Sequence, residues 1–226
     1  MGEIKLYNVD GVNISLRRRI LNVQAKTYHH GNLAAEILLR AAEVIDEDGI
    51  EALSLRGIAR DLGVSHSAPN RHFKNKAALL SALATDGWLK VRDATLNEAE
   101  ATGSDDPHVK LNAMGRGYLR WALNNRALFR AIYHPDVSRQ ASDELRGAIE
   151  RFASTVRAAV DETQRDGRHP EADLRALTLF TNAVPTGAAV LLLDSMIGHE
   201  MAEGLESEKL IEEVINLVVP LPNAES

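Results

Sequence analysis

The sequence predicts an all-α protein, and three observations lead to this fold class. Hydrophobic residues make up 45% of the 226 residues while aromatic residues make up only 4%, a balance that favours Ala- and Leu-rich helices over sheets. No segment shows the strict alternation of apolar and polar residues that is typical of a strand, and no internal repeat is present. We therefore expect about nine helices, with a three-helix unit near the N-terminus and a longer helical bundle after it.

Residues 1–27 carry no clean helical period, and Arg17 to Arg19 form the only three-residue basic run of the chain. We expect a flexible N-terminal arm, which either reaches DNA phosphates and the minor groove or is a solvated extension. His29 and His30 follow it. Because no further ligand is placed with them, the sequence favours a backbone or phosphate contact over a metal site.

The first helix is expected to begin after Asn32, which is a suitable N-cap, and to end at Gly49. Its apolar residues recur at helical spacing and are expected to face inward: Leu33, Ile37, Ala41, Val44 and Ile45. The role of this helix is to brace the two short helices that follow.

Leu53 to Leu80 is the stretch around which the rest of the chain is organised. Ser54 is expected to cap a short helix that ends at Gly63 in the left-handed conformation, and Ser65 to cap a second helix of about two turns. The apolar stripe of the first of these helices consists of Leu55, Ile58, Ala59 and Leu62. Two short helices joined by a Gly-containing turn form a helix-turn-helix, whose second helix enters the major groove of DNA. A helical corner with solvated polar residues is the alternative.

The stretch from Tyr28 to about Trp88 resembles the N-terminal DNA-binding domain of the TetR/AcrR family of transcriptional regulators. The resemblance lies in YHHGNLAAEILLRAAEVIDEDGIEALSLRGIARDLGVSHSAPNRHFKNKAALL. HHGNL and APNRHF are similar to the branch with a WHG-type C-terminal domain, and VPTGAAVLLL resembles its signature segment. Two positions depart from the family pattern: Thr186 stands where that segment has histidine, and Asn70 where a tyrosine is common.

The resemblance implies a helix-turn-helix DNA-binding domain over residues 28–75 and an effector-binding and dimerisation domain over residues 76–226. It implies a homodimeric repressor that a small apolar effector releases from a palindromic operator. Base edges are expected to meet His66, Ser67, Asn70 and Arg71. Phosphates are expected to meet Arg56, Ser65, His72, Lys74 and Lys76. The expected partners are double-stranded operator DNA, a second copy of the chain and an unidentified small molecule.

The body is expected to contain helices over residues 75–101, 108–124, 126–133, 139–166, 171–197 and 206–219, with TGSDDP (residues 102–107) as a linker. Pro185 lies inside the most apolar of these helices and should kink it, which either makes space for a ligand or adjusts the packing. The last two helices are the dimer candidates, with burial inside one subunit as the alternative. Their apolar residues are Leu174, Leu177, Ala188, Leu191 and Leu192, and Leu210, Ile211, Val214, Ile215 and Val218.

Large side chains gather on a few body helices and suggest an apolar pocket with a few polar groups, although ordinary core packing explains each of them as well. The candidate ligand contacts are Trp88, Met114, Tyr118, Trp121, Phe129, Tyr133, Phe152, Phe180, Asn182 and Thr186. Two other classes compete with a regulator: an enzyme, for which no nucleophile elbow, P-loop or dinucleotide fingerprint is present, and a ligand-binding protein without an operator. The departure from the family pattern at Asn70 is the only support for a ligand-binding protein without an operator.

The net charge of −6 is unevenly divided: residues 1–90 hold 12 Lys/Arg and 10 Asp/Glu, and residues 91–226 hold 14 and 22. A weakly basic front on an acidic body agrees with a DNA-reading head. The chain has no cysteine, and we expect no metal and no cofactor. We also expect no membrane span, because no apolar run approaches about 18 residues, and no signal peptide. A soluble cytoplasmic protein follows.

Overall fold

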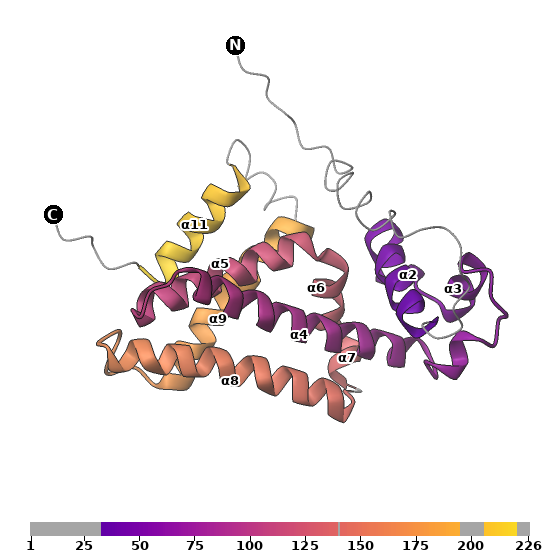
Figure 1. Cartoon of the computed structure of the whole chain (residues 1–226), viewed down its shortest axis with the longest axis horizontal. Coiled ribbons are helices and arrows are strands. Elements are labelled where there is room, and N and C mark those ends of the chain that lie inside the picture. The colour runs from indigo at the N-terminus through magenta and orange to yellow at the C-terminus, as the bar shows by residue number, and fades with distance from the viewer. Residues whose placement is uncertain (1–32, 140, 195–205, 221–226) are drawn as a thin grey trace, which may run out of the picture. The chain divides into compact units, whose positions relative to one another are not determined.

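The computed structural model describes residues 33–139, 141–194 and 206–220. These residues form nine α-helices, two 3₁₀ helices and no strand, which confirms the all-α prediction (Figure 1). The elements are α2 (Leu33–Asp48), η1 (Ile50–Ala52), α3 (Leu55–Asp61), η2 (Pro69–Arg71), α4 (Lys76–Ala101), α5 (Pro107–Asn124), α6 (Arg126–Ile132), α7 (Pro135–Arg139), α8 (Asp143–Arg165), α9 (Leu174–Asp194) and α11 (Ser207–Val218).

From Ala34 onward the described residues belong to one compact unit, so the division at residues 75 and 76 stays a prediction. The predictions for the arm over residues 1–27, for His29 and His30, and for the cap Asn32 lie outside the described residues.

The first half of the helix-turn-helix forms as the sequence predicts. Ser54 caps α3, since its hydroxyl oxygen accepts a hydrogen bond from the Gly57 N–H at 3.1 Å. Gly63 has a φ of 66° and ends α3 in the left-handed region. The N–H groups of Gly63 and Val64 donate back to carbonyl oxygens in the last turn of α3, at 3.1 and 3.0 Å. These are the paired bonds of a Schellman C-cap.

The predicted second helix of about two turns, capped by Ser65, does not form as an α-helix, because the chain forms a turn followed by η2. Pro69 has no N–H and cannot donate to the carbonyl of Ser65, the bond that would continue an α-helix here. Instead the Ala68 N–H donates to the Ser65 carbonyl, three residues back, at 2.9 Å. The Ser65 hydroxyl lies 3.4 Å from the Ser67 hydroxyl rather than on a helix N–H, so the predicted cap is wrong as well.

α4 continues from this segment into the body. The Asn75 side chain caps it by accepting from the Ala78 N–H at 2.9 Å. α4 packs against α5, α6 and α8, and Figure 1 shows α4 and α8 side by side. Gly117 of α5 permits the close contact with α4, because a Cβ at this position would lie 2.8 Å from the Ala94 carbonyl oxygen.

Two body helices begin later than predicted. The prediction of one helix over residues 139–166 is wrong at its start, since α7 and α8 are separate and Ser142 caps α8 by accepting from the Leu145 N–H at 3.1 Å. α9 begins at Leu174 rather than at residue 171, because the Asp173 carboxylate accepts the N–H groups of Arg175 and Ala176, at 2.9 and 3.1 Å. Residues 195–197 of the predicted helix lie outside the described residues.

α9 is the most apolar helix, as predicted, and Pro185 within it is buried. Over Leu174–Leu193 it is long and apolar enough to cross a membrane by composition alone, with a mean hydropathy of 1.7, although the sequence analysis expected no such stretch. A core helix of a soluble protein meets the same criterion, and α9 contacts α5, α8 and α11. We therefore treat it as a helix of the bundle.

Candidate nucleic-acid interface and ligand cavity

Eight of the nine predicted DNA contacts are exposed, and they come from α3, η2 and the residues around them. These residues are Arg56, Ser65, His66, Ser67, Asn70, Arg71, His72 and Lys74. Pro69 and Phe73 are buried and anchor the same segment from beneath. The polar side chains therefore lie on the outside of a short, well-anchored turn.

Lys76, the ninth predicted contact, differs from the others because it is half-buried and already bonded. Its ammonium donates to the Glu51 carbonyl oxygen at 3.2 Å and lies 3.6 Å from the Glu51 carboxylate. A phosphate contact at Lys76 would have to compete with these bonds.

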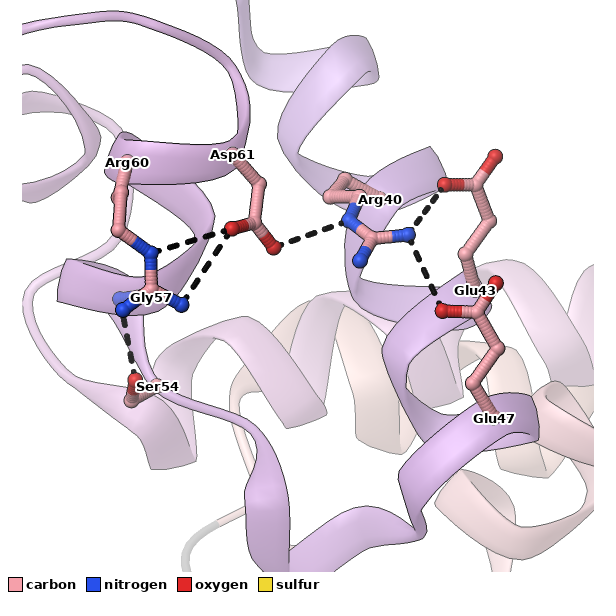
Figure 2. Close-up of polar contacts among 7 residues, drawn as sticks. All are labelled: Arg40, Glu43, Glu47, Ser54, Gly57, Arg60 and Asp61. Carbon is pink, nitrogen blue, oxygen red and sulfur yellow. Dashed lines mark hydrogen bonds and ion pairs between the residues drawn. The ribbon is translucent and has the colours of Figure 1, made fainter.

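The charge of this segment is strongly positive, since from Ser54 to Asn75 the chain holds four Arg or Lys residues and one acidic residue, Asp61. Figure 2 shows that the Arg40 guanidinium of α2 holds this carboxylate, at 3.1 Å. Arg40 also bonds Glu43 at 2.9 Å and Glu47 at 3.4 Å. The hydrogen bonds to Glu43 and Asp61 raise the pKa of Arg40, so it stays charged. Three acidic side chains near the polar surface are thereby partly neutralised.

Arg60, which the sequence did not suggest, has a side chain that is 76% exposed and pairs with the Asp61 carboxylate at 3.4 Å (Figure 2). It lies one turn after Arg56 on α3, and this i, i+4 spacing of two basic residues is the signal that could have found it. A groove of about 510 Å³ lies between α2 and α3, and its wall includes Arg56, Arg60 and His66.

The body holds a small cavity of about 30 Å³ that is lined by residues of five helices. Its wall consists of Thr95, Leu111, Met114, Gly115, Tyr118, Phe152, Val156, Thr181, Asn182, Pro185, Ile215, Val218 and Val219. Four of these side chains are polar and none carries a charge. A volume of this size holds about two water molecules, so a larger ligand requires the walls to move.

Four of the ten predicted ligand contacts line this cavity: Met114, Tyr118, Phe152 and Asn182. Trp121 and Phe129 are buried elsewhere in the body. Trp88 packs against Phe152 with ring centroids 5.1 Å apart and lies behind the cavity wall. Phe180 is 51% exposed and lies on the outer face of α9, away from the cavity wall.

Tyr133 and Thr186, the remaining two, lie outside the cavity wall but bond to it. The Tyr118 hydroxyl is 2.8 Å from the Tyr133 hydroxyl and 2.9 Å from the Thr186 hydroxyl, and the last two are 3.4 Å apart. Burial raises the pKa of Tyr118, so its hydroxyl stays protonated. This triad of hydroxyl groups satisfies its own hydrogen bonds.

Thr181 is a wall residue that the sequence did not suggest, and its buried hydroxyl has no hydrogen-bond partner among the described residues. The signal that could have found it is Pro185, because Thr181 lies four residues before this proline.

α6 connects the body to α2, the helix that braces residues 54–75, which are called the reading segment below. Arg130 of α6 donates to the Ile45 carbonyl oxygen of α2 at 3.5 Å, and the Asp46 side chain accepts from the Ala127 N–H. On its other side α6 packs tightly against α4, since a Cβ on Gly87 would lie 2.7 Å from Ile132. Movement of α6 would therefore reach both α2 and α4.

Two family models match the chain, one over the helix-turn-helix region and one over the body. The family described as bacterial regulatory proteins, tetR family, matches residues 37–83, and the family described as tetracyclin repressor-like, C-terminal domain, matches residues 111–216. The chain is 41% identical over 75 residues to the class C tetracycline repressor protein of Escherichia coli, covering 33% of this chain and 32% of that protein. It is 29% identical over 101 residues to a helix-turn-helix transcriptional regulator of Mycobacterium bovis, covering 45% of this chain and 43% of that protein. The chain thus spans less than half the length of these relatives.

Solved structures share the fold over most of the chain. A Rhodococcus protein of unknown function has a TM-score of 0.71 and 29% identity, covering 86% of this chain and 97% of its own. The TetR family regulator PfmR of Thermus thermophilus has a TM-score of 0.61 and 21% identity, covering 81% and 96%.

Proposed function

Because the chain belongs to the TetR family of transcriptional regulators, we propose that it is a homodimeric, cytoplasmic repressor that a small apolar effector releases from a palindromic operator. Membership makes it a DNA-binding transcription factor rather than an enzyme. The observation that carries the proposal is the exposed polar surface around η2, where Asp61 is the one acidic residue between Ser54 and Asn75 and its carboxylate is bonded by Arg40 and Arg60.

In this proposal η2 and the turn before it enter the major groove. Arg71, His66, Ser67 and Asn70 read base edges, where a bidentate Arg–guanine pair provides about 1–3 kcal/mol of discrimination. Arg56, Ser65, His72 and Lys74 contact phosphates and fix the register. We add Arg60 to the phosphate contacts, and Lys76 takes part only if it leaves Glu51.

A second copy is proposed to bind at the outer face of α9. An exposed apolar stripe, called the α9 stripe below, follows this helix at helical spacing and consists of Ala176, Leu179, Phe180, Ala183, Gly187, Val190 and Leu191. Leu179 is 71% exposed, which is unusual for so large an apolar side chain in a monomer. On α11 the exposed apolar residue is Leu217.

The residues of the predicted dimer surface are only partly available for it. Leu177, Ile211, Ile215 and Val218 are buried inside the subunit, so the burial alternative holds for them. Leu191 belongs to the α9 stripe. Two stripes meeting across a two-fold axis would bury most of their apolar surface and set the distance between the two reading segments.

Effector binding is proposed to enlarge the cavity and to move α6. The cavity wall reaches α6 through the Tyr118–Tyr133 hydrogen bond, since Tyr133 directly follows α6, and α6 reaches α2 through Arg130. A shift of α2 and α4 would change the distance between the reading segments of the two subunits. The dimer would then no longer match the spacing of the half-sites and would dissociate from the operator. The effector must favour the non-binding spacing by a few kcal/mol, because only a difference in affinity shifts the population.

The test is selection of bound duplexes from a random DNA pool at physiological salt, followed by titration of the recovered site. We expect a palindrome with two half-sites about one helical turn apart. Failure of the folded dimer to recover any sequence would refute operator binding. Recovery of a single unpaired half-site would refute the dimeric reading while leaving the DNA-binding surface in place.

A further inference from the structure

The cavity wall offers few polar groups, and most of them are already bonded. Thr95 donates to the Arg92 carbonyl at 2.7 Å, and the Asn182 amide donates to the Thr178 carbonyl at 2.8 Å. The Tyr118 hydroxyl is bonded within the triad.

Thr181 is the exception. Among the described residues, few buried side-chain nitrogen or oxygen atoms lack a hydrogen-bond partner, and of those residues only Thr181 belongs to the cavity wall. Its side chain is buried, as the residue is 8% exposed. A buried hydroxyl without a partner is costly, so such a group indicates a partner that arrives from elsewhere.

The backbone of Thr181 is short of a donor too. In an α-helix the carbonyl of residue i accepts from the N–H of residue i+4. For Thr181 that residue is Pro185, which has no N–H. Thr181 and Pro185 both line the cavity. One wall residue therefore combines a buried hydroxyl that has no partner among the described residues with a carbonyl whose usual helical donor position is a proline.

The electrostatic character of the wall limits what can bind beside Thr181. Among the residues that the structure describes, no Asp, Glu, Lys, Arg or His lines the cavity. An ion that entered it would lose its hydration without gaining a counter-charge, which is strongly unfavourable.

We infer that the effector is an uncharged, mainly apolar molecule with one hydroxyl-type group, which bonds to the Thr181 hydroxyl and carbonyl. This inference rests on the proposed ligand response. A hydroxyl suits the site because it accepts one hydrogen bond and donates another. The apolar part would lie against Met114, Phe152, Val156 and Ile215. Thr181 is then the residue that determines specificity for the polar end of the effector.

The test uses four probes with nearly equal chain length: 1-hexanol, 1-methoxypentane, hexanoate and hexylammonium. Their dissociation constants are measured by calorimetry with the full chain at pH 7. We expect 1-hexanol to bind most tightly, the ether to bind more weakly because it cannot donate, and the two ions to bind at least about tenfold more weakly. Preference for either ion, equal binding of the alcohol and the ether, or no binding of any probe would overturn the inference.

Thr181→Val keeps the shape and removes the hydroxyl, and it should raise the dissociation constant for 1-hexanol about three- to tenfold. Thr181→Ser should restore the affinity. Thr178→Val is the matched control, because Thr178 bonds the Leu174 carbonyl within α9 and lies outside the cavity wall. Thr181→Val should fold at least as well as the natural chain, since it removes a buried hydroxyl without a partner. Equal affinities for all variants would overturn the assignment to Thr181.

Duplex selection is run on the same protein and separates the two proposals. Alcohol binding without duplex binding would refute the operator and leave the cavity assignment in place. Duplex binding without alcohol binding would refute only the cavity assignment.

Discussion

The polar side chains around η2 are exposed, whereas those around the body cavity are largely buried and, apart from Thr181, already hydrogen-bonded. The first arrangement keeps cations such as Arg71 hydrated until a polyanion replaces the water, which suits binding to phosphates and base edges. The second arrangement excludes ions and suits a neutral molecule. The outer face of α9 reverses the first arrangement, because there the exposed residues are apolar. The polarity of each surface therefore suits a different proposed partner: DNA for the surface around η2, a neutral small molecule for the cavity, and a second copy of the chain for the outer face of α9.

The α9 stripe provides the largest expected effect, because a charge in the middle of an apolar interface loses its hydration without compensation. Phe180→Glu should raise the dissociation constant of the dimer at least about 100-fold, in the range of interface hot spots. Analytical ultracentrifugation measures it. Ile149→Glu on α8 is the control, since Ile149 is also an exposed large apolar residue but lies off the stripe. Equal dissociation by both variants, or by neither, would refute the assignment.

Arg71 tests the reading segment. Arg71→Ala should weaken binding to the selected operator about 10- to 100-fold, which corresponds to about 1–3 kcal/mol for a lost base contact. Binding to a scrambled duplex should change little. Arg157→Ala on α8 removes the same charge from another exposed site and should leave both affinities unchanged. Equal losses on the operator and the scrambled duplex would make Arg71 a phosphate contact.

The features that the sequence predicted correctly are those that neighbouring residues determine. The cap at Ser54 and the left-handed turn at Gly63 involve residues only a few positions apart. The same local chemistry, applied to Pro69, would have corrected the second helix, because the missing N–H is visible in the sequence. The free hydroxyl of Thr181 and the salt bridge from Arg40 to Asp61 depend on how distant helices pack, which residue spacing does not determine.

Tight helix packing in the body can be tested separately from its polar groups. Gly117→Ala should destabilise the fold by about 1–3 kcal/mol, because the new Cβ would lie 2.8 Å from the Ala94 carbonyl oxygen of α4. Gly147→Ala within α8 should instead stabilise it by about 0.5–1 kcal/mol, since the nearest atom is the mobile end of Arg151 at 3.3 Å. Urea denaturation of both variants measures the two effects. A neutral or stabilising effect of Gly117→Ala would show that α4 and α5 are packed less tightly than the structure indicates.

The smallest effect concerns the ion pair that holds α11 against the bundle. Arg120 of α5 bonds Glu208 at 2.7 Å and also pairs with Glu98 of α4. The hydrogen bond from Arg120 lowers the pKa of Glu208. The unfolded chain therefore binds more protons than the folded one near the ordinary glutamate pKa of about 4.3, so the contribution is present above that pH and is lost as the pH falls through the lower folded value.

Glu208→Gln should cost about 0.2–1 kcal/mol at pH 7, the range of exposed pairs, because the Glu208 side chain is 63% exposed. The difference from the natural chain should disappear as the pH falls below the lowered pKa of Glu208, where the natural chain has lost the pair as well. Thermal unfolding across this range measures it, and Glu212→Gln on the same helix is the control. A difference that persists at low pH would mean that Glu208 acts through packing rather than charge. α11 would then be held mainly by the apolar contacts of Ile215 and Val218, the same residues that line the cavity, and ligand binding there would have to weaken the principal attachment of the helix.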